Sequence, residues 1–204
     1  MGMLVYFVLI MAVPLLIQWD LMSTYKKYKK VGASSGMSGA DAARKVLDEN
    51  GLYHVTVEMV PGKLTDHYDP ASKTVRLSED NYNGTSIAAV SVALHEIGHV
   101  LQHHEGMVAL KLRSSLVPLA NIGSNVSFFL ILIGILLTSQ SMLLLGIIAM
   151  SFAVLFQVVT LPVEFNASNR ARDLMISSGF ITSNEEHGAK KVLNAASLTY
   201  VASA

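Results

Sequence analysis

Residues 86–104 read SIAAVSVALHEIGHVLQHH. Apolar side chains occupy nearly every helical face of this stretch until its end, and a helix that is apolar all round is a buried helix. We predict such a helix over residues 87–104, with Thr85 or Ser86 capping its first turn. Inside it lies the pattern HEIGH at residues 95–99, in which two histidines flank a glutamate.

The two histidines of this pattern are four positions apart, so a helix places both imidazoles on one face, a single turn apart. His95 and His99 can therefore reach one Zn²⁺ ion at ~2.0–2.1 Å. Glu96 cannot bind the same ion from its position beside His95, but it can take a proton from a water molecule on that ion. The alternative is a helix with satisfied core histidines, but burying these groups without partners costs on the order of a few kcal/mol.

A catalytic zinc site needs a third protein ligand. The chain has no cysteine. The positions three and six residues after His99 hold Gln102 and Glu105, not the glycine and histidine of a metzincin extension. The 50 residues 114–163 carry no charge, and the first carboxylate after them is Glu164. We predict Glu164 as the third ligand.

Glu164 begins one face of a predicted helix. Ser168 and Arg172 follow at four-residue spacing, so the three side chains line one side of that helix. A hydroxyl and a cation behind a carboxylate are typical of a metal ligand with supporting side chains. A solvated glutamate at the edge of a membrane is the alternative interpretation.

The composition is that of a membrane protein. Hydrophobic residues make up 51% and charged residues 15% of the 204 residues, against about 25% charged residues in typical soluble domains. Fifteen basic and fifteen acidic residues cancel, so the chain lacks the basic footprint of a nucleic-acid binder. The absence of cysteine excludes a disulfide scaffold and thiolate metal sites.

Three stretches are long and apolar enough to predict spans of a lipid bilayer. They are residues 3–19, about 119–137 and 142–161, with the polar turn TSQS (138–141) between the last two. The basic residues near the first stretch follow it, so we predict an uncleaved anchor over residues 1–22 rather than a signal peptide or a core helix. Residues 192–204 are small and apolar, and we predict the start of a further helix there.

Clusters of basic residues near the spans predict their orientation. Such clusters lie at positions 26–30, 111–113 and 170–172. They share one side of the membrane only if residues 23–113 and 164–191 are cytoplasmic. We therefore predict a multi-pass protein of the cell membrane. A cytoplasmic part with the HEIGH helix (31–113) precedes a spanning hairpin (114–161), and a cytoplasmic helix that carries Glu164 (162–191) follows it.

The polar region before the HEIGH helix mixes helix and strand signals. Residues 38–50 resemble a capped amphipathic helix, and residues 54–59 and 73–78 alternate as strands do. The dipeptide Asp69-Pro70 predicts a turn before the second strand. We expect an α+β domain in which residues 73–78 form an exposed sheet edge that can bind an extended peptide.

These motifs together resemble known peptidases. HEIGH with a distant glutamate is similar to the gluzincins, and a spanning hairpin between HExxH and EFxAS is similar to membrane zinc peptidases of the CAAX-protease and heat-shock-peptidase kind. There the glutamate motif usually reads ExxxD, whereas Ser168 stands in the last position here. Nearly the whole chain resembles the YugP-type family of bacterial neutral zinc metallopeptidases, through TDHYDP (65–70), VRLSE (75–79), HEIGH, LKLRS (110–114), NIGSN (121–125) and LPVEF (161–165).

The resemblance implies a minimal gluzincin-like domain combined with at least three spans, and a further apolar helix beyond Ala204. It implies a zinc-dependent endopeptidase acting on protein or peptide substrates that are cytoplasmic or membrane-associated. We expect one Zn²⁺ per chain on His95, His99 and Glu164, with Glu96 as general base. The candidates for stabilising the oxyanion are His67, Tyr68 and Arg172, of which helical spacing favours Arg172.

Two other functions remain open at this point. The chain can be a membrane scaffold or peptide-binding protein with a structural zinc, although a buried Glu96 would then cost free energy for no purpose. It can also be a zinc hydrolase of another class acting on soluble substrates, although the order of helix, strands and HExxH is typical of peptidases.

Overall fold

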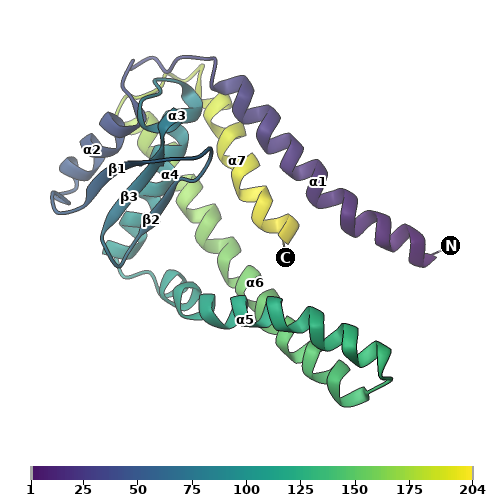
Figure 1. The fold of residues 1–204 in the computed structure, drawn as a ribbon. Coiled ribbons are helices and arrows are strands. Elements are labelled where there is room, and N and C mark those ends of the chain that lie inside the picture. Colours follow the sequence, from purple (N-terminus) through teal and green to yellow (C-terminus); the bar gives the residue numbers. More distant parts are fainter. Residues whose placement is uncertain (1, 204) are drawn as a thin grey trace.

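A computed structural model describes the backbone of residues 2–203 and the side chains of residues 12–198. Its elements, in chain order, are α1 (Gly2–Tyr28), α2 (Gly39–Glu49), β1 (Thr56–Val60), β2 (His67–Asp69), β3 (Thr74–Ser78), α3 (Glu79–Tyr82), α4 (Ile87–His104), α5 (Val108–Leu136), α6 (Gln140–Ser177) and α7 (Glu186–Ser203). Figure 1 shows the small sheet and the short helices gathered at one end, with the long helices extending from it. The predicted mixture of helix and strand is confirmed.

The sheet has three strands in the order β1-β3-β2. β3 pairs in parallel with β1 and antiparallel with β2, where Tyr68 lies opposite Val75. The expectation that residues 73–78 form an exposed edge is therefore wrong, because β3 is the central strand. β2 was missed because three residues are too few to leave a recognisable alternation in the sequence.

The buried helix is α4, and it begins and ends where the pattern predicts. The Ser86 hydroxyl accepts a hydrogen bond from the Ala89 amide at its first turn, which satisfies one of the amides that a helix leaves unpaired. Ala88, Ala89, Val90 and Ser91 point to four different sides of α4, and all four are buried. The central position of α4 follows from its uniformly apolar surface.

Helices α5 and α6 form an antiparallel hairpin whose turn falls at residues 137–139, overlapping the predicted turn at 138–141. α6 runs without a break through Pro162. The predicted division between a span ending at residue 161 and a separate helix starting at 162 is thus absent from the backbone. A proline inside a helix removes one hydrogen bond, here the bond to the Val158 carbonyl, and the remaining turns keep the helix continuous.

Among the described residues, two helices are long and apolar enough to cross a membrane, Val108–Leu136 and Gln140–Ser177. Both expose large apolar side chains, including Ile122, Phe128, Phe129, Leu144 and Ile147. Part of the predicted first span, residues 3–11, lies outside the described side chains, and so does the end of the predicted apolar segment 192–204. Residues 3–11 and 192–203 are helical in the backbone, within α1 and α7.

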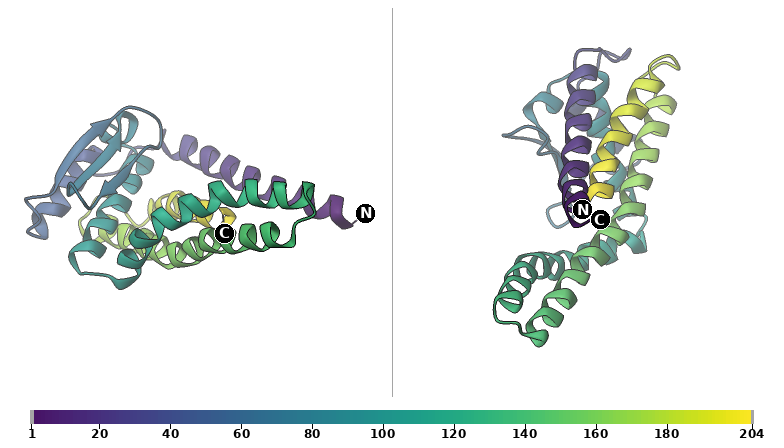
Figure 2. Two further views of the ribbon diagram at one scale, coloured as in Figure 1. Left: turned by 60° about the horizontal axis from the view of Figure 1, so that its bottom comes forward. Right: turned by 90° about the vertical axis from the view of Figure 1, so that its right-hand side faces the viewer.

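The long helices extend from the same side of the domain. In the left view of Figure 2, α1, α7 and the α5–α6 hairpin all run in the same direction from the part that holds the sheet. α1 and α7 lie side by side, as both figures show. Trp19 and its neighbours Leu15 and Leu16 on α1 are exposed.

Candidate metal centre

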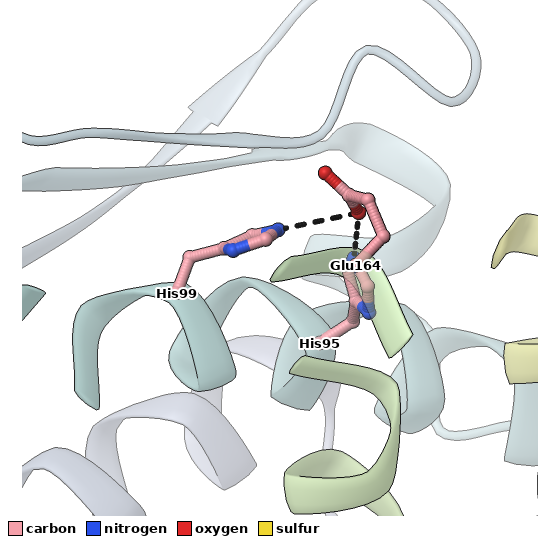
Figure 3. A group of neighbouring side chains, drawn as sticks. All are labelled: His95, His99 and Glu164. Carbon is pink, nitrogen blue, oxygen red and sulfur yellow. Dashed lines mark hydrogen bonds and ion pairs between the residues drawn. The ribbon is translucent and has the colours of Figure 1, made fainter. Parts of the chain in front are cut away.

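The two histidines of α4 and the glutamate of α6 converge on one point, although 65 positions separate His99 from Glu164 in the sequence. The Nε2 atom of His95 lies 3.1 Å from Oε2 of Glu164, and the Nε2 atom of His99 lies 3.5 Å from the same oxygen. Figure 3 shows both rings turned toward the carboxylate. All three ligand atoms lie within 4.8 Å of one another.

These distances suit a zinc ion. Two ligand atoms at ~2.0–2.1 Å from a tetrahedral zinc stand about 3.3 Å apart, and the observed separations of 3.1 and 3.5 Å bracket that value. The Glu164 side chain is fully buried, its Oε2 atom faces both imidazoles, and its Oε1 atom is paired with Arg113. A His₂Glu donor set with one open position is that of catalytic zinc sites.

A glycine allows the two helices to approach closely enough. A Cβ atom at Gly98 would lie 2.8 Å from the carbonyl oxygen of Ala167 and 3.0 Å from its Cα. Such distances are shorter than carbon contacts in packed interiors. Gly98 therefore lets α4 touch the backbone of α6 one turn after Glu164, and this contact brings Glu164 within reach of both imidazoles.

The His99 ring is oriented by a glutamine that the sequence analysis used only to exclude a metzincin. Gln102 is buried, and its amide NH₂ donates to the carbonyl of Val163 at 2.8 Å and to Oδ1 of Asn166 at 2.9 Å. Its Oε1 atom faces Nδ1 of His99 at 2.9 Å. Because that oxygen can only accept, Nδ1 carries the proton and Nε2 keeps its lone pair for a metal.

The orienting contacts continue to the surface. Arg170 donates from Nε to Asn166 at 2.8 Å and forms a bidentate pair with Glu105, both contacts at 2.6 Å. This pair lowers the pKa of Glu105 through the hydrogen bonds from Arg170. Gln102 and Glu105, the two positions that departed from the metzincin pattern, thus both belong to the structure that fixes α4 against α6.

The other ring, His95, is oriented by a hydroxyl. Oγ of Ser168 lies 3.2 Å from Nδ1 of His95 and 2.8 Å from Oγ of Ser197. The Ser197 hydroxyl donates to the carbonyl of Leu193 one turn earlier in α7. Ser168 must therefore donate to Ser197 and accept from Nδ1 of His95 if the chain of bonds is complete. Ser168 thus orients the His95 ring with a neutral hydroxyl, at the position where the related motif usually has an aspartate.

Glu96 lies beside the metal ligands and faces the space around them. It is buried, and burial raises its pKa above the ordinary value for glutamate, with His95 and His99 opposing the shift. Two hollows flank it, and both are lined by His95 and Glu96. A carboxylate of raised pKa next to a metal group is suited to accept and then return a proton.

Of the three residues predicted to stabilise the oxyanion, His67 and Tyr68 lie near the metal ligands, whereas Arg172 does not. His67 and Tyr68 of β2 line the more polar hollow. The Tyr68 hydroxyl is bonded to Nδ1 of His103 at 2.9 Å. Arg172 instead pairs with its neighbour Asp173 at 3.1 Å, and it is not among the residues that line either hollow.

Sequence reasoning missed a role for Arg113. Its Nη2 atom lies 3.2 Å from Oε1 of Glu164, and its side chain lines the polar hollow. It was read only as a marker of membrane orientation. Arg113 is the last charged residue before the uncharged stretch and Glu164 is the first after it, and an antiparallel hairpin brings the two ends of such a stretch together.

Comparisons with known proteins also point to zinc. The family described as "Putative neutral zinc metallopeptidase" matches residues 3–204. The chain belongs to this family. A Bacillus subtilis (strain 168) protein named "Putative membrane protease YugP" is 57% identical over 187 residues, which are 92% of this chain and 83% of that protein. No solved structure matches the chain.

Membership of the zinc metallopeptidase family makes zinc the metal to expect at His95, His99 and Glu164. The buried carboxylate, the two lone pairs directed at it and the matching ligand separations fit that ion independently of the family. The relative's name and the two apolar helices agree in pointing to a membrane protein.

Proposed function

We propose that this chain is a membrane-anchored, zinc-dependent endopeptidase with a gluzincin-type site. One zinc ion per chain is held by His95, His99 and Glu164. The observation that carries the proposal is the position of Glu96, a buried carboxylate of raised pKa next to the ligands and facing both hollows. In a purely structural zinc site, a buried carboxylate that does not bind the metal would cost free energy without a benefit.

The division of chemical roles follows from the residues. Bound zinc supplies a Lewis acid and lowers the pKa of water to ~7. Glu96 accepts a proton from the attacking water while the oxygen of that water adds to the carbonyl carbon of the peptide. Glu96 then returns that proton to the leaving amine nitrogen, so that one carboxylate serves as base and then as acid.

Several residues hold this arrangement without taking part in proton transfer. Gln102 and Ser168 keep the two Nε2 lone pairs directed at one point. Arg113 holds the second oxygen of Glu164. With the ligands fixed in advance, little reorganisation is needed during the reaction.

The substrate backbone is proposed to lie along β2. This strand is the sheet edge at the polar hollow, and it contributes His67 and Tyr68 to the lining. An extended peptide can add to such an edge through main-chain hydrogen bonds. Of the three candidates for stabilising the oxyanion, His67 and Tyr68 have a place beside the ligands, and the contact of Arg172 with Asp173 disfavours Arg172.

The membrane placement is proposed with the catalytic part in the cytoplasm. Three basic clusters favour that side, and α1, α5 and α6 are proposed as three spans. The substrates are then proteins or peptides of the cytoplasm or of the membrane surface, and no nucleic acid is expected. Under this topology the metal centre lies close to the inner membrane surface.

The decisive experiment compares wild type with Glu96→Gln in detergent, with zinc content and cleavage of denatured casein as readouts. Glu96→Gln keeps the shape of the side chain and all three ligands but removes the group that accepts the proton. Zinc should remain bound, and hydrolysis should fall by roughly 10²–10⁴, the usual contribution of a positioned base.

Glu58→Gln provides a matched control, because Glu58 lies on the outer strand β1 and its side chain is 54% exposed. It should retain both zinc and activity. If Glu96→Gln cleaves casein as fast as wild type, the endopeptidase proposal fails and a membrane scaffold with structural zinc takes its place.

A further inference from the structure

The second hollow beside Glu96 is an apolar pocket of about 170 Å³. Its floor is formed by Val92, His95 and Glu96 of α4, and Leu64 and Asp66 contribute from the loop before β2. Its remaining walls come from the two ends of the chain. Leu21 and Tyr25 of α1 face Val192, Leu193 and Ala196 of α7 across it. The helix expected to serve only as an anchor is therefore part of the site.

The wall that α1 provides is fixed in place. The Tyr25 hydroxyl donates to the buried Oδ1 of Asn81 at 2.7 Å, and Lys29 pairs with Asp80 at 2.6 Å. On its other side, α1 packs closely on α7, because a Cβ at Gly188 would lie 2.6 Å from the Tyr28 ring. The pocket is therefore preformed, which lowers the entropic cost of filling it.

The chemistry of the lining selects one kind of occupant. Both oxygens of the Asp66 carboxylate are engaged, by the amide and hydroxyl of Ser78 and by the amide NH₂ of Asn81. Glu96 is the only other carboxylate in the lining, and it is committed to the reaction. The rest of the surface, apart from His95 and the Tyr25 hydroxyl, is aliphatic or aromatic carbon. An apolar cavity of roughly 150 Å³ is known to hold a benzene ring.

We propose that this pocket is the subsite that receives a large apolar side chain, aromatic or aliphatic, from the substrate residue adjoining the scissile bond. The inference rests on the proposed peptidase function and deepens it by naming the substrate class. The scissile carbonyl must lie at His95 and Glu96, and these two residues are shared by the pocket and the polar hollow. A peptide lying in the polar hollow therefore directs a neighbouring side chain between α1 and α7.

The first test maps cleavage sites in denatured casein by mass spectrometry for wild type, Ala196→Leu and Asn194→Leu. Wild type should cut next to Phe, Leu, Ile or Met at least about tenfold more often than next to Gly, Asp or Lys, the discrimination that a hydrophobic pocket provides. Ala196→Leu fills the pocket and should shift cleavage toward Ala and Gly. Asn194→Leu adds the same side chain on the exposed side of α7 and should leave the preference unchanged.

A second test measures binding without hydrolysis. The protein for this test carries Glu96→Gln, and the probes are two fluorescein-labelled peptides that differ only in a Phe or a Gly at the residue that adjoins the scissile bond. The Kd values of the two peptides should differ about tenfold, and Ala196→Leu should abolish the difference. Should Ala196→Leu fail to fold, Leu21→Ala enlarges the same pocket from α1 and should extend the cleavage preference to Trp.

The outcomes separate the two proposals. Wild type that binds the Phe peptide preferentially but cleaves nothing would overturn the endopeptidase function and leave the pocket assignment standing. Wild type that cleaves with a preference for charged or small residues, or a preference that neither Ala196→Leu nor Leu21→Ala alters, would overturn the pocket assignment and leave the endopeptidase function standing.

Discussion

The two halves of α6 have opposite surroundings although they form one continuous helix. In residues 140–161, large side chains such as Leu144 and Ile147 are exposed, and the contact with α5 is made at glycines, where Ile131 packs on Gly146. In residues 162–177, Glu164, Ala167 and Ser168 are buried between α4 and α7. The first half can face lipid, whereas the second half holds a charge inside the protein.

The difference shows that one continuous helix can join an exposed apolar segment to a segment that carries a buried carboxylate. Glu164 directly follows the uncharged stretch, so the exposed apolar half and the half that carries Glu164 belong to one continuous helix. Because the two halves pack against different elements, a substitution in the second half should weaken metal binding, and a substitution in the first half should weaken the packing of α5 on α6.

The largest effect is expected from Glu164→Gln, which removes the anionic ligand of the second half. Zinc affinity should fall more than about 100-fold, beyond the 10–100-fold loss typical when only an outer hydrogen bond is removed. Activity should fall with zinc occupancy, and added zinc should restore part of both. Elemental analysis and casein cleavage on the same preparations provide the measurement.

Asp173→Asn, on the same helix with a side chain 68% exposed, is the control and should retain its metal. Full zinc occupancy in Glu164→Gln, together with loss of zinc in Asp173→Asn, would show that the wrong carboxylate has been assigned as ligand.

The second prediction concerns the membrane side of each half. Single cysteines can be introduced without background, because the chain has none. A cysteine at Ser139, in the hairpin turn, should react with an impermeant maleimide added to intact cells. A cysteine at the exposed Ser72, before β3, should react only after permeabilisation. Labelling in the opposite pattern would reverse the topology and remove the cytoplasmic substrates from consideration.

A matched pair of glycine substitutions sharpens the comparison further. Gly98→Ala would press on the Ala167 backbone in the second half, and Gly123→Ala would press on the Ala149 carbonyl in the first half. Each should cost about 1–3 kcal/mol of stability through overpacking. Only Gly98→Ala should displace Glu164 and lower zinc affinity, whereas Gly123→Ala should lower thermal stability in detergent with zinc retained. Equal zinc loss in both would mean that the halves are not separable.

The sequence allowed a helix and candidate metal ligands to be predicted where a local pattern of residues has a direct structural or chemical meaning. The apolar run and its cap predicted both ends of α4, the HEIGH spacing pointed to the two histidines, and the uncharged stretch pointed to Glu164 as the next carboxylate. Arg172 was favoured on helical spacing alone, which describes one helix and cannot reveal a competing partner such as Asp173.

The remaining features depend on contacts between distant segments. Gln102 orients His99 only because Val163 and Asn166 engage its NH₂ group, and no pattern within α4 encodes those partners. β2 became a strand through pairing with β3. The pocket between α1 and α7 joins the two ends of the chain, which no local periodicity can place together.

The smallest effect is expected from Ser168→Ala, which removes the acceptor for Nδ1 of His95 and leaves every ligand atom in place. The ring then loses one of the constraints on its orientation, and zinc affinity should fall by roughly tenfold or less, the lower end of the range for outer hydrogen bonds. Ser197→Ala removes only the partner of Ser168 and should have a weaker effect still. Competition with a zinc chelator across the series Glu164→Gln, Ser168→Ala and Ser197→Ala should rank the three losses of zinc affinity in that order.

A Ser168→Ala variant that loses as much zinc as Glu164→Gln would show that the hydroxyl contacts the metal itself. The helix face that begins at Glu164 would then supply two ligands, and the open position assigned to water would be filled by protein.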